Sequence, residues 1–345
     1  MLWNLAKVQE QNGGRVIYQG NVASLLCVET PTAQMMKQKV QINANPLVAN
    51  EGYEIKNAHC HNLKNVTAII PKNILTAVTG VAGSGKSSLV CHEFVKRFPQ
   101  AIVIDQKSIG TSIRSTPATY TGVMDKIRKL FGKANNVSAS WFSYNSKGGC
   151  EVCKGTGQIS YDMAFAEPVV VPCEECGGHR YNSTALSYKY RGLNIEDIMN
   201  LTIEQAMEFF DNQKIRSSLQ SLVDVGLDYL TLGQPTSTLS GGEVQRVKLA
   251  SELHKQGEIY VLDEPSTGLH GKDVEKLLTL LRKLVSQGNT VVIVEHRLEL
   301  IAQADWIIDM GPEGGIKGGK VIFQGTPKEI LQSNVSKTGR YLSLF

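Results

Sequence analysis

The segment GVAGSGKS (Gly80–Ser87) constrains the fold of this chain more than any other stretch of its sequence. It fits the pattern G-x-x-x-x-G-K-S/T, with an apolar, strand-like segment before it and a helical pattern from Lys86 onward. Glycines in such a loop let backbone N–H groups turn inward around phosphates, and the helix N-terminus adds a favourable field. We therefore expect a nucleotide-phosphate loop (P-loop), with Lys86 against the β- and γ-phosphates and Ser87 on Mg²⁺.

Strand-like and helix-like segments alternate on both sides of this loop. Upstream, NVTAIIPKNILTAVTG reads as two short strands that meet at Pro71 and Asn73. Further strands are expected at 101–105, 258–263, 290–294 and 306–310, and helices at 86–98, 243–255 and 272–286. Strands that alternate with helices imply a mostly parallel sheet, so the sequence predicts an α/β core.

The middle of the chain interrupts this alternation. Residues 106–145 are polar, residues 146–182 form a Cys/Gly-rich island, and residues 195–232 carry apolar residues at helical spacing. We interpret the island and the helices after it as an insertion into the α/β core.

The composition excludes several classes of protein. No apolar run approaches the roughly 18 residues of a membrane span, and the N-terminus lacks the pattern of a signal peptide. We therefore expect a cytoplasmic protein with no membrane partner. The net charge of +4 permits nucleic acid as a partner but does not argue for it.

Three polar residues follow predicted strands and are candidates for the chemistry of a nucleotide site. The strand in IYVLDEP delivers Asp263 toward Mg²⁺, and Glu264 is placed to polarise an attacking water. The strand in VVIVEH ends in His296, which could reach a γ-phosphate. Taken singly these signals are weak, because strands often end in Asp and a His in such a place is more often a surface residue.

The segment TLSGGEVQRVKLASEL strengthens those signals. Ser240, Gly241 and Gly242 lie just before a predicted helix that starts near Glu243, which makes a second phosphate-binding helix N-terminus. The P-loop, Gln106, this segment, the Asp-Glu pair and the His, in that order, resemble the ATP-binding cassette (ABC) ATPases. In that family the LSGG segment binds the γ-phosphate of a nucleotide held by an opposing cassette. This chain has one P-loop and one LSGG segment, so the resemblance implies a second cassette as partner.

The resemblance also implies a set of site residues. It assigns catalytic roles to Lys86, Glu264 and His296. It assigns the binding of Mg²⁺ to Ser87 and Asp263. Contacts to ATP fall to Gly80, Val81, Ala82, Gly83, Ser84, Gly85, Lys86, Ser87, Ser88 and Gln106, and in trans to Ser240, Gly241 and Gly242.

Four of the seven cysteines form two tight pairs, Cys150-x2-Cys153 and, 19 residues later, Cys173-x2-Cys176. Each pair places two thiolates on one turn, and two such turns can close a tetrahedron around a structural Zn²⁺. Two disulfides or a redox pair are the alternatives. Four basic side chains surround the pairs and either meet DNA phosphates or form a solvated rim: Lys147, Lys154, His179 and Arg180.

The chain closely resembles the UvrA family, the ATPase subunits of the bacterial UvrABC excinuclease, over nearly all of residues 50–345. The segments that carry the resemblance are GVAGSGKSSLV, DQKSIGTSIRSTPATYTGVMDKIRKLF, GGCEVCKGTGQISYDM, CEECGGHRYN, LSGGEVQRVKLASEL, LDEPSTGLH and ADWIIDMGPEGG. They match the C-terminal of the two UvrA cassettes. The resemblance implies an ABC-type ATPase core with an inserted signature region that carries a four-cysteine zinc module.

The same resemblance implies a function. UvrA proteins sense DNA damage as dimers, use ATP to modulate DNA binding, and load the partner UvrB in nucleotide excision repair. We expect ATP, Mg²⁺ and structural Zn²⁺ as cofactors and DNA as a partner. The second cassette is expected either from a second copy of this chain or from a separate N-terminal UvrA-like half. The UvrB-binding region of the family lies in an N-terminal cassette that this chain does not show, so loading of UvrB is not expected of this chain alone. A regulatory or drug-resistance ATPase of UvrA descent, a transporter ATPase subunit and a non-functional gene fragment are the alternatives.

An internal repeat bears on the first residues of the chain. GGRVIYQG at 13–20 matches GGKVIFQG at 318–325, so residues 1–45 resemble the end of a preceding cassette. We expect this segment either to pack poorly or to dock on a partner. The sequence thus predicts three parts besides this first segment. The ATP-binding core comprises residues 46–120 and 237–345, and the inserted signature region comprises residues 121–236, with the zinc module at 150–176.

Overall fold

The computed structural model describes residues 2–5, 16–30, 32–33, 40–109, 113–163, 166–253, 255–269 and 271–344. The chain divides into two compact units, Met1–Asp105 with His254–Phe345 (unit 1), and Gln106–Leu253 (unit 2). Unit 2 contains the predicted insertion and extends beyond it at both ends, so that Gln106 and the LSGG segment belong to it.

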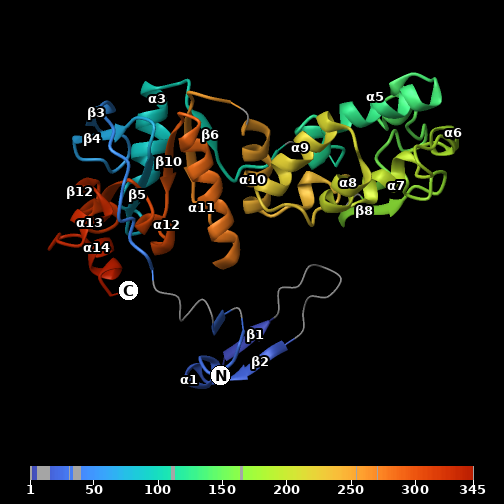
Figure 1. Ribbon diagram of the computed structural model, residues 1–345. Coiled ribbons are helices and arrows are strands. Elements are labelled where there is room, and N and C mark those ends of the chain that lie inside the picture. Colours follow the sequence, from blue (N-terminus) through green and yellow to red (C-terminus); the bar gives the residue numbers. More distant parts are fainter. Residues whose placement is uncertain are drawn as a thin grey trace. The chain divides into compact units, whose positions relative to one another are not determined.

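Unit 1 is built on a six-stranded sheet with the order β12-β11-β5-β10-β9-β6 (Figure 1). Neighbours from β11 to β6 pair in parallel, and β12 joins the edge antiparallel to β11. The strands are β5 (Leu75–Gly80), β6 (Ile102–Ile104), β9 (Ile259–Asp263), β10 (Thr290–Val294), β11 (Trp306–Gly311) and β12 (Lys320–Gly325). This pairing confirms the expectation of a mostly parallel α/β sheet. Strands of such a sheet are buried on both faces and need helices on each side.

Apolar side chains at the centre of the sheet explain its position in the core. Every residue of β10 is buried, as are the first five of β5. The helical segments of this unit are η1 (Ser88–Phe94), α3 (Val95–Arg97), α11 (Gly271–Ser286), α12 (Leu298–Ala302), η4 (Gly315–Lys317), α13 (Pro327–Ile330) and α14 (Lys337–Leu342). The first of these, predicted as part of an α-helix, is π-helical directly after the P-loop. In the part of the chain that is described, no helix is both long and apolar enough to cross a membrane.

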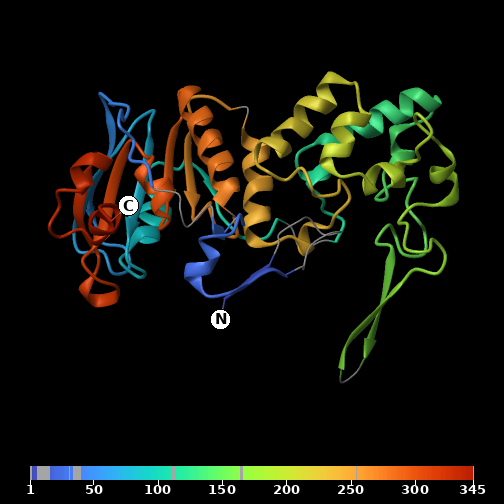
Figure 2. The same ribbon diagram turned by 60° about the horizontal axis from the view of Figure 1, so that its bottom comes forward.

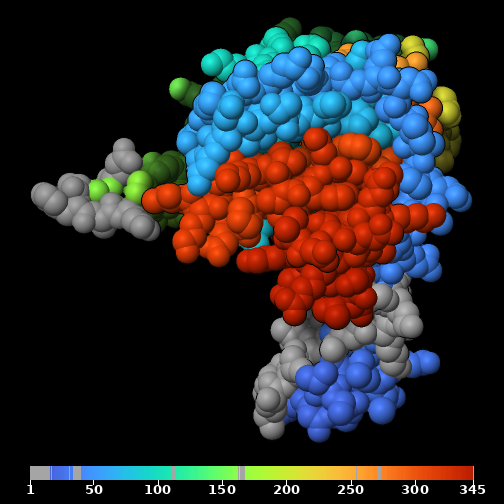
Figure 3. All heavy atoms as spheres, turned by 90° about the vertical axis from the view of Figure 1, so that its left-hand side faces the viewer, coloured from blue at the N-terminus to red at the C-terminus, as the bar shows by residue number. Residues whose placement is uncertain are grey.

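A second sheet in unit 1 pairs β3 (Gly52–Ala58) with β4 (Val66–Pro71) antiparallel. In Figure 3 this segment, in blue, lies beside the orange and red C-terminal segment on the same face. A hydrogen bond from Lys64 N to Gly319 O, 2.8 Å long, joins the two. The loop between β3 and β4 is thereby held over the C-terminal hairpin.

Unit 2 is mainly helical, and a two-stranded ribbon projects from it (Figure 2). The ribbon pairs β7 (Gln158–Met163) with β8 (Ala166–Pro172) antiparallel. Its helices are α4 (Pro117–Tyr120), α5 (Val123–Asn135), η2 (Ala139–Phe142), α6 (Ser183–Ser187), α7 (Ile195–Asn200), α8 (Ile203–Phe209), α9 (Gln213–Asp224), η3 (Thr236–Thr238) and α10 (Gly241–Glu252).

The described part of residues 106–145, which read as polar, contains three of these helices, α4, α5 and the short η2. Thr116 forms a capping box with Thr119 at the start of α4. In α5, Val123, Ile127 and Phe131 are buried at a spacing of four residues, which places them on one face of the helix. Polar residues between these positions conceal the stripe in the linear sequence.

The N-terminal residues form a hairpin of their own. Strand β1 (Leu2–Leu5) pairs with β2 (Val16–Gly20) in a two-stranded sheet, followed by the short helix α1 (Val22–Leu25). Residues 6–15, including the first three positions of the repeated octapeptide, lie outside the described residues.

This hairpin repeats the closing hairpin of unit 1 in detail. Leu2 pairs with Gly20 as Ile307 pairs with Gly325, and the register shifts after the third pair in both. A side chain then caps the helix that follows each hairpin, from Asn21 in one copy and Thr326 in the other. In the described residues, the sequence repeat is therefore a structural repeat of two paired strands followed by a capped helix.

Candidate functional site

The carboxyl ends of three adjacent parallel strands bring together the predicted nucleotide residues of unit 1. In the strand pairing, Val294 of β10 lies opposite Val78 of β5 on one side and opposite Asp263 of β9 on the other. The P-loop leaves β5 two residues after Val78, and His296 follows β10 by two residues. In open parallel sheets this edge is where ligands bind.

The P-loop carries a partly buried cation and a buried hydroxyl group. Lys86 Nζ donates to Gly80 O at 3.0 Å and to Val81 O at 3.2 Å, which curls the side chain over the loop. Burial lowers the pKa of Lys86, and the carboxylates of Glu264, Asp263 and Asp309 oppose that shift. The side chain oxygen of Ser84 is buried without a hydrogen-bond partner among the described residues. A cation and an orphan hydroxyl within one glycine-rich loop fit a polyphosphate.

Asp263 and Glu264 lie at the same edge as Lys86. Burial raises the pKa of Asp263, the neighbouring Glu264 raises it further, and Lys86 acts in the opposite direction. A partly buried carboxylate in this setting fits a divalent cation, which would offset the desolvation. Glu264 has a φ of 49°, and its backbone N–H donates to Val294 O at 2.9 Å, so the chain turns sharply at this residue. His296 Nδ1 lies 3.8 Å from Glu264 Oε1, and both side chains are exposed.

Glu295, which the sequence reasoning passed over, positions His296. It is fully buried, and its carboxylate accepts from the backbone N–H groups of Ser266 (3.0 Å), His296 (2.9 Å) and Arg297 (3.1 Å). One side chain thus ties the loop after β9 to the loop after β10. The signal in the sequence was a charged residue directly after four apolar residues, because a charge carried at the end of a buried strand needs a hydrogen-bond or ion-pair partner.

Asp309 of β11 is a second residue that the sequence reasoning missed. It is buried, it accepts from Ser336 Oγ at 2.6 Å and from Thr338 Oγ1 at 3.2 Å, and burial raises its pKa. Its charge acts on Lys86, so it belongs to the electrostatic surroundings of the P-loop.

The LSGG segment in unit 2 forms a capped helix start. Ser240 is the N-cap of α10, and Glu243 returns a hydrogen bond to the Ser240 N–H at 2.7 Å. Tyr229 also donates to Glu243, at 2.5 Å. Gln106 lies against this helix start, since a Cβ built on Gly241 would be 3.1 Å from Gln106 Oε1. The sequence motif is therefore a helix N-terminus with its side-chain cap in place.

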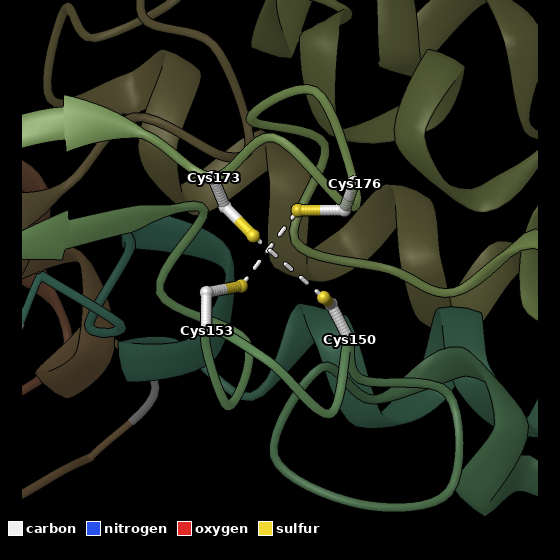
Figure 4. A group of neighbouring side chains, drawn as sticks. All are labelled: Cys150, Cys153, Cys173 and Cys176. Carbon is white, nitrogen blue, oxygen red and sulfur yellow. Dashed lines mark hydrogen bonds between the residues drawn. The ribbon is translucent and has the colours of Figure 1, made fainter.

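The four paired cysteines converge in unit 2 (Figure 4). All four are buried, and their sulfur atoms lie within 4.8 Å of one another. The Cys150–Cys173 and Cys153–Cys176 sulfurs are 3.9 and 3.7 Å apart. Tetrahedral Zn–S bonds of about 2.3 Å separate sulfurs by roughly 3.8 Å, so the donor set fits zinc. It does not fit disulfides, whose sulfurs are about 2.05 Å apart.

The predicted DNA-contact residues lie around this cluster and differ in whether their side chains contact other side chains of the protein. Lys147 and Lys154 are exposed. His179 Nδ1 contacts Glu196 Oε1, and the Arg180 guanidinium lies 5.8 Å from the Tyr144 ring centroid. The latter two side chains therefore already have protein partners.

Known proteins share this arrangement of segments. The family model described as ABC transporter matches residues 63–267. The chain is 46% identical over 369 aligned residues to UvrABC system protein A of Staphylococcus aureus, with 96% of this chain and 39% of that protein covered. The protein of the same name from Staphylococcus epidermidis is 46% identical over 368 residues, with the same coverage.

A solved structure is also similar to this chain over nearly its whole length. UvrA2 from Deinococcus radiodurans matches with a TM-score of 0.91 and 40% identity, covering 99% of this chain and 46% of that one. The resemblance to UvrA proteins and the fold that the motifs predicted are confirmed. The chain spans 39% of the length of the curated relatives named above.

Proposed function

This chain belongs to the ABC transporter family of ATP-binding cassettes, and on that premise we propose that it binds and hydrolyses ATP with Mg²⁺. The observation that carries the proposal is the convergence of the P-loop, Asp263, Glu264 and His296 at the carboxyl ends of β5, β9 and β10. A chance glycine-rich turn would not bring a cation, two carboxylates and an imidazole to one sheet edge.

Each residue has a role that follows from its position. Lys86 and the P-loop amides hold the β- and γ-phosphates, while Ser87 and Asp263 hold the cation. Mg²⁺, when bound, neutralises charge on the phosphate oxygens. Glu264 accepts a proton from the attacking water, and His296 beside it donates to a phosphate oxygen. Gln106 contacts ATP, and Ser240, Gly241 and Gly242 at the start of α10 contact in trans the γ-phosphate of a nucleotide held by a second cassette.

ATP hydrolysis by the full chain, measured as phosphate release with Mg²⁺, tests this proposal. Lys86→Ala should lose nucleotide binding, and Asp263→Asn should lose the response to Mg²⁺. Unchanged phosphate release in Lys86→Ala would contradict the assigned site.

The substrate on which this ATPase acts is proposed to be DNA, in nucleotide excision repair and in the cytoplasm. The support is the similarity along 96% of the chain to UvrABC system protein A, together with a zinc-fitting cluster rimmed by lysines. Lys147 and Lys154 are the proposed phosphate contacts, because both are exposed.

Binding of duplex DNA with and without Mg-ATP tests this second proposal. Lys147→Ala and Lys154→Ala should each reduce the slope of log affinity against log salt by about 1. Lys328→Ala, an exposed lysine on α13 of unit 1, is the matched control and should leave the slope unchanged. Equal effects of all three variants would argue against a contact at the zinc module.

We also propose that the working form contains a second cassette. A single LSGG segment serves a nucleotide held by another cassette, and the β1–β2 hairpin supports the idea independently. It repeats the register of β11–β12, which in unit 1 closes the sheet beside the P-loop strand, yet it forms a separate sheet here. Residues 1–45 are accordingly proposed as the closing segment of another core.

Light scattering on the Glu264→Gln variant tests this arrangement. A slowed hydrolysis step should let ATP accumulate between cassettes, so the mass of the variant should rise with Mg-ATP and fall with ADP. A constant mass for the chain, alone and with a separate cassette, would contradict the composite site.

A further inference from the structure

A P-loop can bind phosphate only while its backbone N–H groups point inward. The carbonyl groups of the same peptides then point outward, and each needs a donor of its own because buried backbone acceptors are nearly always paired. Which groups supply those donors decides how firmly the loop keeps its phosphate-binding shape.

Within the loop, Lys86 Nζ donates to Gly80 O and Val81 O. For two further carbonyls of the loop, those of Gly83 and Ser84, the donors come from outside the P-loop. Gly83 O accepts from the backbone N–H of Gly315 at 3.0 Å and from the Asn62 side chain Nδ2 at 2.9 Å. Ser84 O accepts from the backbone N–H of Gly319 at 3.0 Å. Two successive P-loop carbonyls are therefore held outward by three N–H donors.

These donors lie in two loops of unit 1 that brace each other. Asn62 is in the loop between β3 and β4, and the two glycines are in the loop between β11 and β12. Lys64 joins the loops through its backbone N–H to Gly319 O and its side chain Nζ to Ile316 O. Asn62 Nδ2 also reaches Gly315 O at 3.3 Å, so one amide group contacts both the P-loop and its neighbour.

The approach of the loops is close enough to require glycine. A Cβ on Gly319 would lie 1.9 Å from Asn62 O, and a Cβ on Gly314 would lie 2.4 Å from Ala82 O. Both distances are far below van der Waals contact. The GPEGGIKGG segment thus lets backbone pack on backbone behind the P-loop.

We propose that Asn62 and the loop at 312–319 are positioning elements of the nucleotide site, which keep the P-loop carbonyls outward and its N–H groups available to phosphate. The proposal rests on the proposed binding of ATP. Asn62 is the part that a substitution can test most cleanly, because it acts through a side chain and is only partly exposed. It is a positioning residue, since its amide donates to a P-loop carbonyl, that of Gly83.

The test is calorimetric titration of the full chain with Mg-ATP. Asn62→Ala removes the hydrogen bond to the P-loop at Gly83 O together with the longer one to Gly315 O, and loss of the P-loop contact should weaken ATP binding about three- to tenfold. Asn62→Asp keeps the shape but replaces the donor by an acceptor that faces two carbonyls, so it should weaken binding at least as much. His59→Ala, in the same loop, is the matched control and should bind like the wild type.

A kinetic readout separates positioning from general support of the fold. Because the P-loop binds phosphate in both the ground state and the transition state, the variants should raise KM and leave kcat nearly unchanged. Their thermal unfolding without nucleotide should match that of the wild type. If Asn62→Ala does not fold, Asn62→Asp and Asn62→Gln decide the matter, since only Gln retains the amide donor.

Three outcomes distinguish the proposals. If the wild type binds ATP and Asn62→Asp binds it equally well, the positioning role is wrong. If Asn62→Asp lowers the unfolding temperature and leaves KM unchanged, Asn62 serves only the fold, which also overturns the inference. If the wild type binds no ATP, the proposed function fails before the question of Asn62 arises.

Discussion

At the scale of single residues, the candidate site is a balance of charges at one sheet edge. Lys86 loses solvation by burial, which lowers its pKa, and three carboxylates hold its proton in place. Asp263 is the reverse case, because burial and Glu264 both raise its pKa. Bringing these groups together costs folding free energy that a bound cation and phosphates would offset, which is typical of functional sites.

Glu264→Gln tests the assignment of the proton acceptor. The amide cannot take a proton from water, so phosphate release should fall by about 10² to 10⁴. ATP affinity should be retained, because Glu264 lies beyond the P-loop. Steady-state phosphate release and calorimetric titration measure the two quantities, and a variant with full turnover would remove Glu264 from the mechanism.

Glu295→Gln tests the buried carboxylate that orders two loops. Its three backbone N–H donors would face an uncharged amide, one half of which is itself a donor. We expect a loss of about 1–3 kcal/mol in the free energy of unfolding, measured by urea denaturation. Hydrolysis should fall as well because His296 loses its position, and the exposed Glu299→Gln on α12 is the matched control.

At the scale of elements, the N-terminus of helix α10 is capped by the capping box of Ser240 and Glu243. Partial burial acts to raise the pKa of Glu243, but the hydrogen bonds from Tyr229 and Ser240 outweigh it, so the pKa lies below the ordinary value of 4.5. The cap links the LSGG segment to the residues before it. An element that presents N–H groups to a nucleotide must remain helical to its first residue.

This cap predicts a pH dependence. Because the folded state lowers the pKa of Glu243, its contribution is complete above pH 4.5 and is lost as the pH falls through the folded-state value. Glu243→Gln should lower the free energy of unfolding by about 1 kcal/mol at pH 7. The difference from the wild type should shrink in acid, and a gap that widens there would contradict the assignment. Tyr229→Phe should show part of the same loss.

At the scale of the whole molecule, the two units contain different parts of the proposed sites. The P-loop, Asp263, Glu264 and His296 are in unit 1, whereas the LSGG segment, Gln106 and the cysteine cluster are in unit 2. The sequence order alternates between the units, because unit 2 is an insertion between β6 and the segment that leads to β9.

Loss of the proposed zinc ion tests this division. Four buried cysteines without an ion would leave unit 2 short of the binding energy that helps to fold it, so Cys173→Ser should lower the unfolding temperature of that unit. ATP binding to the P-loop should remain. Metal analysis, calorimetry and nucleotide titration measure the three quantities, and Cys27→Ser, an exposed cysteine outside the cluster, is the matched control.

Much of the fold was predictable because its signals are local. The P-loop, the apolar strands that lead to Asp263 and His296, and the paired cysteines each combine residue type with short spacing. The structure has them close to the expected positions, although β10 ends at Val294, two residues before His296. The helices at 106–145 were missed because polar residues conceal the stripe of Val123, Ile127 and Phe131.

The rest was decided by contacts between residues far apart in the chain. The sequence by itself determined the nucleotide loop, the parallel strands, the metal-fitting cysteines and the repeat of the closing hairpin. Each of these depends on residues that lie close together in the sequence. Only the tertiary structure decided that Asn62 and Gly319 hold the P-loop carbonyls and that Glu295 ties the loop containing Ser266 to His296. The physical reason is that every buried polar group needs a partner, and folding brings that partner from a distant segment.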